Sequence, residues 1–154
     1  MRVIFVCTGN TCRSPMAEKI FADMTKDDGV EVESRGVMCR KGAPMALNAA
    51  MVMHDMHLST EHESTPLSES DIKDADYIIT MTAGHKAVIE EMLGKSDNVV
   101  TLDSLTHGGD IPDPYGMDIN VYRATAAKIK EELTKLKEII VNNGKKDKST
   151  KIGY

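Results

Sequence analysis

Nine residues near the amino terminus constrain this chain more than any other segment. They read Cys-Thr-Gly-Asn-Thr-Cys-Arg-Ser-Pro over 7–15, directly after the mainly apolar run 2–6 and directly before a helical pattern. A strand, a tight loop and a helix in that order direct backbone N–H groups and the positive end of the helix to one point. Gly9 and Asn10 tolerate the positive φ angles that such a loop needs. The segment therefore predicts a loop that holds a tetrahedral anion, such as phosphate, without a metal.

The two ends of this loop carry side chains suited to phosphate chemistry. The guanidinium of Arg13 can bond two phosphate oxygens at once. Cys7 would lie beneath the anion, where several N–H dipoles favour its thiolate. We therefore expect Cys7 to be a nucleophile that attacks phosphorus. The alternative is an ordinary strand-turn-helix junction, because Cys and Arg at this spacing also arise by chance.

Composition limits the class of protein. The 154 residues, 41% hydrophobic and 28% charged, suffice for one domain with a single core. A net charge of -5, with no basic block before residue 145, argues against nucleic acid as the main partner. No apolar stretch reaches the roughly 18 residues of a membrane span, and no signal-peptide core follows Met1, so we expect no membrane partner and a cytoplasmic location. Three cysteines, two of them in the loop, indicate reactive or buried thiols rather than a disulfide framework.

Strand candidates alternate with helical patterns along the chain. The strands are expected at 3–7, 30–34, 76–81 and 98–102, and the helices at about 14–27, 44–56 and 84–93. This alternation predicts a single-domain α/β fold, with a twisted parallel sheet of about four strands and helices on both faces. Ligands bind such sheets at the carboxyl ends of the strands, which is where the loop after the first strand belongs.

The ends of two helices carry recognisable signals. Ser14 is a candidate N-cap of the first helix, with Pro15 at its first position. The last helix is expected after the cap candidate Asp118, and its apolar stripe runs to Ile140. That stripe is compatible with a coiled coil, but it lasts only about three heptads and so favours packing against the sheet. The domain is expected over 1–142, with a disordered tail over 143–154.

A thiolate that attacks phosphorus also needs an acid to protonate the leaving group. The sequence Ile-Pro-Asp-Pro-Tyr-Gly over 111–116 offers Asp113. Flanking prolines stiffen the segment, and an apolar setting made by Pro114 and Tyr115 would favour a protonated carboxyl. An Asp between prolines is by itself most often a turn residue. Combined with the upstream loop, the catalytic interpretation is preferred.

The runs Val-Cys-Thr-Gly-Asn-Thr-Cys-Arg-Ser-Pro-Met-Ala-Glu over 6–18 and Asp-Pro-Tyr-Gly over 113–116 strongly resemble the low-molecular-weight protein tyrosine phosphatases, over about residues 1–142. The fold expected is a flavodoxin-like three-layer sandwich. The resemblance implies a protein phosphatase with a phosphocysteine intermediate, in which Cys7 is the nucleophile, Arg13 clamps phosphate and stabilises the transition state, and Asp113 is general acid and later base. Such an enzyme takes phosphorylated proteins as substrates, releases inorganic phosphate, and uses neither cofactor nor metal.

The resemblance also suggests roles around the loop. Asn10 would brace it, and the Ser14 hydroxyl would hydrogen-bond the Cys7 thiolate, roles that suit short polar side chains at a helix entrance. The substrate-binding residues expected are Thr8, Gly9, Asn10, Thr11, Cys12, Ser14 and Tyr115.

Thr11 points to one branch of this family. Tyrosine-specific members usually carry Ile or Leu there, whereas the bacterial protein-arginine phosphatases carry Thr; these also resemble the chain in Met-Thr-Ala-Gly-His-Lys over 81–86 and in Gly116. The side chain of phosphoarginine is planar and cationic, so Asp113 can pair with it and Tyr115 can lie against its flat face. We therefore expect phosphoarginine as substrate, with phosphotyrosine as the alternative and Thr11 then a neutral loop residue.

Functions of other classes are less consistent with the residues. An oxidoreductase of the arsenate-reductase type needs two further cysteines, and only Cys39 lies outside the loop. A phosphocarrier or other anion-binding module would need no distant acid, and flavin binding calls for no facing Cys and Arg.

A few residue groups allow both a functional and a structural interpretation. A zinc site at His54, His57 and His62 lacks a fourth ligand, so we expect surface histidines. Cys12 is either a small buried thiol or, as the family resemblance partly suggests, a reversible disulfide partner of Cys7. The methionines of the segment are interpreted as core, although a flexible binding surface is the alternative: Met45, Met51, Met53 and Met56.

Overall fold

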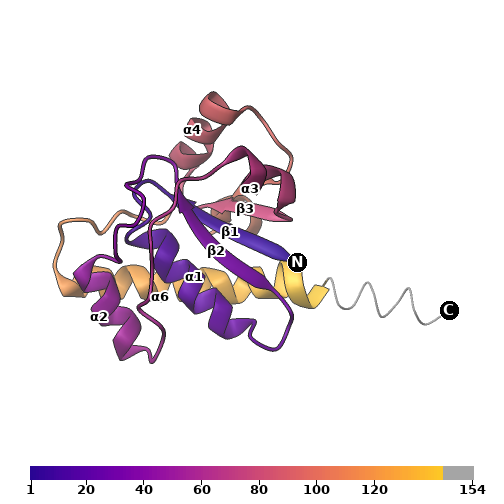
Figure 1. Cartoon of the computed structure of the whole chain (residues 1–154). Helices are drawn as coiled ribbons and strands as arrows, with labels where there is room; N and C mark the ends of the chain where they lie inside the picture. Colours follow the sequence, from indigo (N-terminus) through magenta and orange to yellow (C-terminus); the bar gives the residue numbers. More distant parts are fainter. Residues whose placement is uncertain (144–154) are drawn as a thin grey trace.

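The computed structural model describes residues 1–143, which form a parallel four-stranded sheet with helices on both faces (Figure 1). The strand order is β2-β1-β3-β4. The strands are β1 Arg2–Cys7, β2 Glu31–Gly36, β3 Tyr77–Thr80 and β4 Val99–Thr101. Every strand pair is parallel. The predicted three-layer α/β fold and its four strands are therefore confirmed.

Six α-helices and one π-helical segment complete the described chain. They are α1 Arg13–Met24, α2 Leu47–Asp55, α3 Glu69–Asp74, α4 Ala83–Leu93, α5 Leu102–Thr106, α6 Ile119–Leu136 and η1 Lys137–Asn142. Two short helices, α3 and α5, were not predicted. Ser68 and Asp71 form a capping box at the start of α3, a local signal that the sequence does contain. The fourth strand was predicted one residue too long at each end, because it begins at Val99 and Leu102 already belongs to α5.

The central strand β1 explains how the layers pack. Its side chains alternate, so that Val3 and Phe5 join the core cluster under α1, α2 and α6, while Ile4 and Val6 join the cluster under α3 and α4. All of these side chains are fully buried, as expected for a parallel strand covered on both faces. The ring of Phe5 meets Phe21 of α1 edge to face, with centroids 5.5 Å apart. This packing fixes the direction in which β1 delivers the loop at its end.

The last helix packs as predicted. Asp118 caps α6 by accepting bonds from the backbone N–H groups of the helix's first turn. The apolar stripe is buried in the core, which favours packing over a coiled coil: Tyr122, Ala126, Ile129, Leu133, Leu136 and Ile140. The tail predicted over 143–154 lies outside the described residues, except that Asn143 continues the helical backbone.

The predicted cap of the first helix was wrong. Helix α1 begins at Arg13, with Cys12 at the cap position and no side-chain cap, so Ser14 lies inside the first turn. The Ser14 hydroxyl is instead turned towards Cys7 and Asn10. Pro15 fits the first turn because the N–H that it lacks has no partner inside a helix. The helix therefore starts without a side chain that competes for its first N–H groups.

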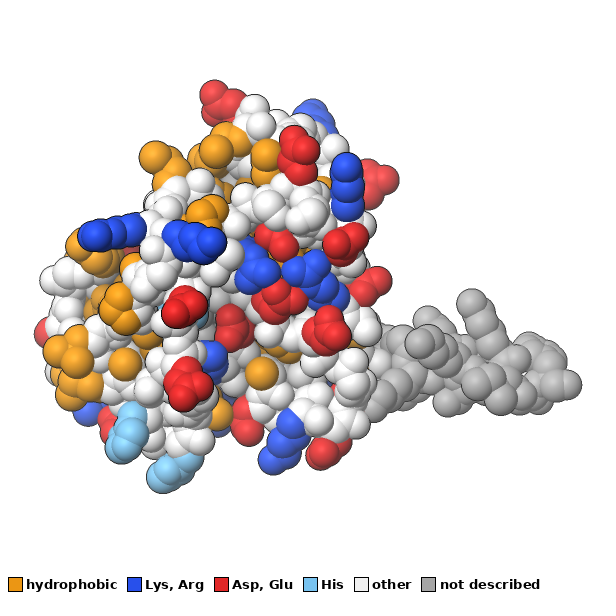
Figure 2. Space-filling model, in the orientation of Figure 1, with side chains coloured by type: hydrophobic (Ala, Val, Ile, Leu, Met, Phe, Trp, Pro, Cys, Tyr) orange, Lys and Arg blue, Asp and Glu red, His pale blue; other side chains and the backbone are white. Residues whose placement is uncertain are grey.

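Ion pairs tie strands β1 and β2 to the covering helix α3. Arg2 of β1 contacts Glu33 of β2 at 2.6 Å and Asp71 of α3 at 3.0 Å. Arg35 lies 3.1 Å from the same Asp71 carboxylate. Figure 2 accordingly shows basic and acidic side chains interleaved over β2. Both arginines are therefore paired with carboxylates within the fold.

The structure also bears on the methionine segment and on the expectation that no segment spans a membrane. Met45 and Met53 are buried core residues, but Met51 is exposed, so the interpretation as core holds only for part of the methionine segment. Among residues 1–143, no helix combines the length and apolar character needed to cross a membrane.

Gly36 allows β2 to approach the loop after β1. A Cβ atom at this position would lie 2.7 Å from the Thr8 carbonyl oxygen and 2.7 Å from Cys39 Cβ. We expect Gly36→Ala to lower the free energy of unfolding by about 1 to 3 kcal/mol, because backbone atoms must move to admit the methyl group. Urea unfolding measures this loss. Gly84→Ala in α4 is the matched control, since its Cβ would meet only ordinary contacts; equal stability of the two variants would refute the expectation.

Candidate active site

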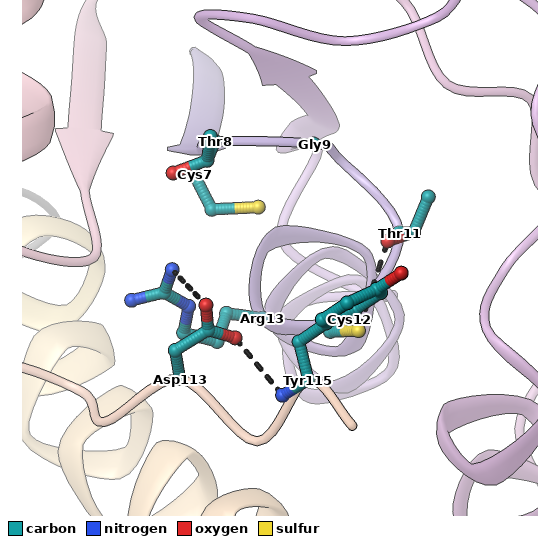
Figure 3. Close-up of a pocket in the computed structure, with 8 residues that line it drawn as sticks. All are labelled: Cys7, Thr8, Gly9, Thr11, Cys12, Arg13, Asp113 and Tyr115. Carbon is teal, nitrogen blue, oxygen red and sulfur yellow. Dashed lines mark hydrogen bonds and ion pairs between the residues drawn. The ribbon is translucent and has the colours of Figure 1, made fainter. Parts of the chain in front are cut away.

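Eight of the ten predicted site residues line one cleft of about 230 Å³ at the carboxyl end of the sheet (Figure 3). They come from the 7–13 loop, which runs from the last residue of β1 to the first residue of α1, and from the 110–118 loop, which precedes α6. The lining residues are Cys7, Thr8, Gly9, Thr11, Cys12, Arg13, Asp113 and Tyr115. The remaining two, Asn10 and Ser14, lie buried behind the loop. Two segments a hundred residues apart in the chain thus form a single site.

The carbonyl groups of the 7–13 loop are bonded from outside. Val37 N–H donates to the Cys7 carbonyl at 3.0 Å, Met38 N–H to that of Thr8 at 3.0 Å, and Ala46 N–H to that of Thr11 at 2.9 Å. In a trans peptide the N–H points opposite to the carbonyl. The N–H groups paired with these outward carbonyls therefore face the cleft, which makes it an anion-binding concavity.

Cys7 lies at the floor of the cleft, with its sulfur directed inward (Figure 3). Its Sγ is 2.9 Å from Ser14 Oγ. Asn10 Nδ2 donates to that oxygen at 2.8 Å, so the single Ser14 proton can go either to the sulfur or to the more distant Arg35 carbonyl, at 3.4 Å. The contact suggested by the family resemblance is thus present, and it fixes the position of Sγ.

Asn10 supports the bend of the loop. Its φ is 54°, in the left-handed region that Asn tolerates better than most residues. The buried amide donates to Ser34 Oγ at 3.0 Å as well as to Ser14, and its oxygen accepts from Thr65 N–H at 3.0 Å. Each polar atom of this side chain is satisfied inside the protein, so the bend is held by specific bonds.

The histidines depart in part from expectation. His54 and His57 are exposed, as predicted, but His62 is half-buried. A carbonyl oxygen only accepts, so His62 Nε2 donates to the Asn10 carbonyl, at 2.6 Å. His62 is therefore a further brace of the loop, which its position 52 residues away concealed. Within residues 1–143, no three His, Cys, Asp or Glu side chains are arranged to hold a metal ion.

The guanidinium of Arg13 is buried and held from several sides. Its Nη1 donates to the Ile111 carbonyl at 3.0 Å. Its Nη2 lies 3.6 Å from Asp113 Oδ2 and 3.5 Å from His85 Nε2. Figure 3 shows the group beside the Cys7 sulfur, with the Asp113 carboxyl in front of it. Arg13 therefore links the two loops and presents its remaining N–H donors to the cleft.

The setting of Asp113 differs from the one predicted. Pro114 is buried, whereas the Asp113 side chain is 56% exposed and its carboxyl lies 3.6 Å from the Arg13 guanidinium. Its Oδ1 accepts from Tyr115 N–H at 3.0 Å. The loop itself is anchored, because Ile111 N–H donates to the Met81 carbonyl at 3.0 Å. Asp113 thus projects over the cleft from a fixed support.

The wall opposite Arg13 is made by Thr11, Cys12 and Tyr115 (Figure 3). Thr11 Oγ1 lies 3.7 Å from Cys12 Sγ, and the Tyr115 ring stands at the rim, 74% exposed.

Burial raises the pKa of the Cys12 thiol, whose sulfur also contacts the Tyr122 hydroxyl at 3.3 Å. Cys12 is therefore a neutral thiol at physiological pH. It and Cys7 are free, and their disulfide stays a hypothesis.

His85 is a site residue that the sequence did not reveal as one. It lies in the first turn of α4, 6% exposed, and its Nε2 is 3.0 Å from Thr8 Oγ1. Burial, and then the Arg13 charge, lower the pKa of His85 to about 4. The ring is therefore neutral at physiological pH. The 81–86 motif marked the segment, but nothing in the sequence connects it to Thr8 or Arg13.

Comparisons with known proteins agree on the family. The family described as low molecular weight phosphotyrosine protein phosphatase matches residues 2–147. Over 141 residues the chain is 38% identical to a protein-arginine-phosphatase of Bacillus subtilis, covering 88% of this chain and 94% of the relative. It is 36% identical to a low molecular weight protein-tyrosine-phosphatase, PtpB, of Staphylococcus aureus, covering 91% and 99%.

Solved structures extend the likeness to the fold. One is the YwlE arginine phosphatase, in a variant whose active-site cysteine is replaced by serine and whose serine is phosphorylated. It superimposes with a TM-score of 0.86 at 37% identity, covering 90% of this chain and 94% of that one. A low molecular weight protein tyrosine phosphatase of T. tengcongensis gives 0.85 at 38% identity, covering 90% and 98%.

The lowered pKa of His85 predicts how stability depends on pH. Between about pH 6.5 and 4 the unfolded chain protonates His85 and the folded chain does not, so the wild type should lose stability as the pH falls through this window. The loss assigned to His85 is about 3 kcal/mol. Urea unfolding of wild type and His85→Gln at pH 7 and pH 4 isolates it. A stability difference between the two proteins that is the same at both pH values would contradict the assignment.

Proposed function

This chain belongs to the low-molecular-weight phosphotyrosine protein phosphatase family, and from that premise we propose that it hydrolyses phosphoarginine in proteins through a phosphocysteine intermediate. Membership makes it a cysteine-dependent phosphatase of phosphorylated proteins. One observation carries the proposal: the Cys7 sulfur, the Arg13 guanidinium and the Asp113 carboxyl converge on a single anion-sized cleft beside Thr11.

In the first step the phosphoryl group lies against the loop N–H groups and Arg13. The Cys7 thiolate attacks phosphorus, an S–P bond forms, and the bond from phosphorus to the guanidino nitrogen breaks. Asp113, in its acid form, gives its proton to that nitrogen, so arginine leaves with its normal charge. Arg13 and Asp113 are 3.6 Å apart, so their ion pair is loose. The phosphate oxygens can therefore replace the Asp113 carboxylate as acceptors of the Arg13 N–H groups. Asp113 is then free to face the leaving group.

In the second step a water molecule replaces the leaving group. Asp113, now a carboxylate, accepts a proton from the water while the water oxygen attacks the phosphorus of the phosphocysteine. The S–P bond breaks, inorganic phosphate is released, and the Cys7 thiolate is restored. The phosphorylated active-site serine in the YwlE variant supports a phosphoryl acceptor at the cysteine position of this family.

The preference for phosphoarginine rests on the wall and rim of the cleft. Relatives of both specificities are about equally similar to this chain, so the argument depends on particular residues. Thr11 brings a hydroxyl where an aromatic substrate favours an apolar side chain. Gly116 has a φ of 76°, a conformation that disfavours any residue with a side chain, and no atom lies within 4 Å of the place that a Cβ would take. The open rim suits a long, planar cation between Asp113 and Tyr115.

Phosphotyrosine stays the second candidate, because the exposed Tyr115 ring also suits stacking against an aromatic side chain. The redox alternative lacks a thiol relay, since Cys39 is the single cysteine outside the loop.

We further propose a cytoplasmic location, which three free thiols support. We also propose that the protein has no nucleic-acid or membrane partner, in keeping with the net charge of -5.

The role of Asp113 is tested through the leaving group. Asp113→Asn should slow turnover by about 10²- to 10⁴-fold for substrates whose leaving group needs a proton, and much less for nitrophenyl phosphate. Steady-state rates on the two kinds of substrate measure the difference. Asp97→Asn, an exposed substitution remote from the cleft, is the control. An equal loss on every substrate would make Asp113 a structural residue.

The substrate class is tested with phosphoarginine and phosphotyrosine peptides side by side. The wild type should prefer phosphoarginine, and Thr11→Ile should shift the ratio of kcat/KM values towards phosphotyrosine by roughly 5- to 150-fold, because a hydroxyl is lost and apolar volume gained. Thr11→Val removes the hydroxyl while keeping the shape, and so separates the two causes. A wild type that prefers phosphotyrosine would assign the chain to the tyrosine phosphatases.

A further inference from the structure

The Met-Thr-Ala-Gly-His-Lys motif over 81–86 has no part in the mechanism above, yet the structure brings its histidine to the cleft. His85 reaches the 7–13 loop from α4, and its Nε2 lies 3.0 Å from Thr8 Oγ1 and 3.5 Å from Arg13 Nη2. The imidazole is almost completely buried. One nitrogen therefore contacts both a loop residue and the guanidinium.

The chemistry of the partners decides which nitrogen carries the proton. A guanidinium has donors only, so the nitrogen that faces Arg13 presents its lone pair. The Thr8 hydroxyl can rotate and donate to the same nitrogen. The proton then lies on Nδ1, which is buried and has no hydrogen-bond partner among the described residues. His85 thus serves as a neutral acceptor, bought at the cost of one unsatisfied N–H.

The charges around the ring maintain this neutral form. Burial and the Arg13 cation both oppose protonation, and they outweigh the opposing carboxylates of Asp110 and Asp113. A protonated ring would direct an N–H at the N–H groups of Arg13. His85 therefore keeps the same hydrogen-bonding role across the physiological pH range.

The backbone around His85 is fixed to the 110–118 loop. His85 N–H donates to the capping hydroxyl of Thr82 at 3.2 Å, and Ala83 N–H donates to Asp110 Oδ1 at 3.0 Å. The neighbouring Met81 carbonyl accepts from Ile111 N–H, and the Ile111 carbonyl accepts from Arg13. The segment that carries the imidazole is thus part of the support that carries Asp113.

From this geometry we propose that His85 is a positioning residue, whose neutral imidazole accepts a hydrogen bond from Arg13 Nη2 and fixes the rotation of the guanidinium plane. The Ile111 carbonyl restrains one side of the group and His85 another. The remaining N–H donors then point at the phosphoryl oxygens without further rearrangement. The proposal rests on the function proposed above, because it concerns the same cleft.

Such positioning acts mainly on the transition state. The phosphoryl oxygens spread towards a plane as phosphorus becomes five-coordinate, and donors already aimed at that arrangement stabilise it more than the ground state. A loosened Arg13 still attracts a phosphate anion by its charge. Loss of His85 should therefore lower kcat more than it raises KM.

Two polar variants test this with similar chemistry but different reach. The side-chain amide oxygen of Gln can occupy the place of Nε2, whereas the shorter Asn reaches only the place of Nδ1. His85→Asn should lower kcat on nitrophenyl phosphate by about 10- to 100-fold with little change in KM. His85→Gln should recover most of that loss. His54→Gln, on the exposed face of α2, is the control and should behave as wild type.

Binding of anions gives a readout that does not depend on turnover. Vanadate adopts five-coordinate geometry and inorganic phosphate does not, so calorimetry should find vanadate affinity weakened in His85→Asn in parallel with kcat, and phosphate affinity nearly unchanged. Equal behaviour of folded Gln and Asn variants, or equal loss of vanadate and phosphate binding, would overturn the proposal. The substrate class is judged separately, by the wild type's rates on phosphoarginine and phosphotyrosine peptides, so either idea can fail alone.

Discussion

The site depends on the hydrogen bonds and the ion pair that hold the buried guanidinium of Arg13. A buried cation is costly unless hydrogen-bonded and paired, and here the protein supplies a carbonyl, an imidazole and one distant carboxylate rather than a close ion pair. These partners come from the 110–118 loop and from α4, so the same group that receives an anion also joins the segments around it. Arrival of a phosphate dianion completes the pairing that the fold leaves unfinished.

The distribution of the other arginines supports this view of a local positive site. Arg2 and Arg35 are paired with Glu33 and Asp71 at the β2 side of the sheet, where they stabilise layers rather than attract ligands. An acidic protein thereby keeps an attractive field for anions within one cleft. The loop N–H groups add to that field without adding net charge, because outward bonds fix the direction of their peptide dipoles.

Local sequence signals predicted the elements that depend on neighbouring residues. The four strands, the 7–13 loop and the Asp118 cap all follow from contacts within a few residues, and Asp113 followed from a second motif. His62 and His85 were missed because their contacts with the loop span 52 and 77 residues. Ser14 was misplaced as a cap because a tertiary contact with Cys7 uses the hydroxyl that a cap would need. The predicted apolar setting of Asp113 was wrong because the carboxyl pairs with Arg13, which lies 100 residues earlier in the chain, in α1.

The floor and the rim of the cleft differ in how densely they are bonded. Asn10 and Ser14 share partners with strands and loops, whereas Tyr115 and Gly116 border mostly open space. A substitution at the rim therefore disturbs few native contacts, while one at the floor disturbs the fold and the chemistry together. Changes at the rim can therefore alter which phosphorylated side chain fits while the fold and the chemistry at the floor are kept. The bonding pattern makes the substrate specificity of this scaffold easier to change than its catalytic chemistry.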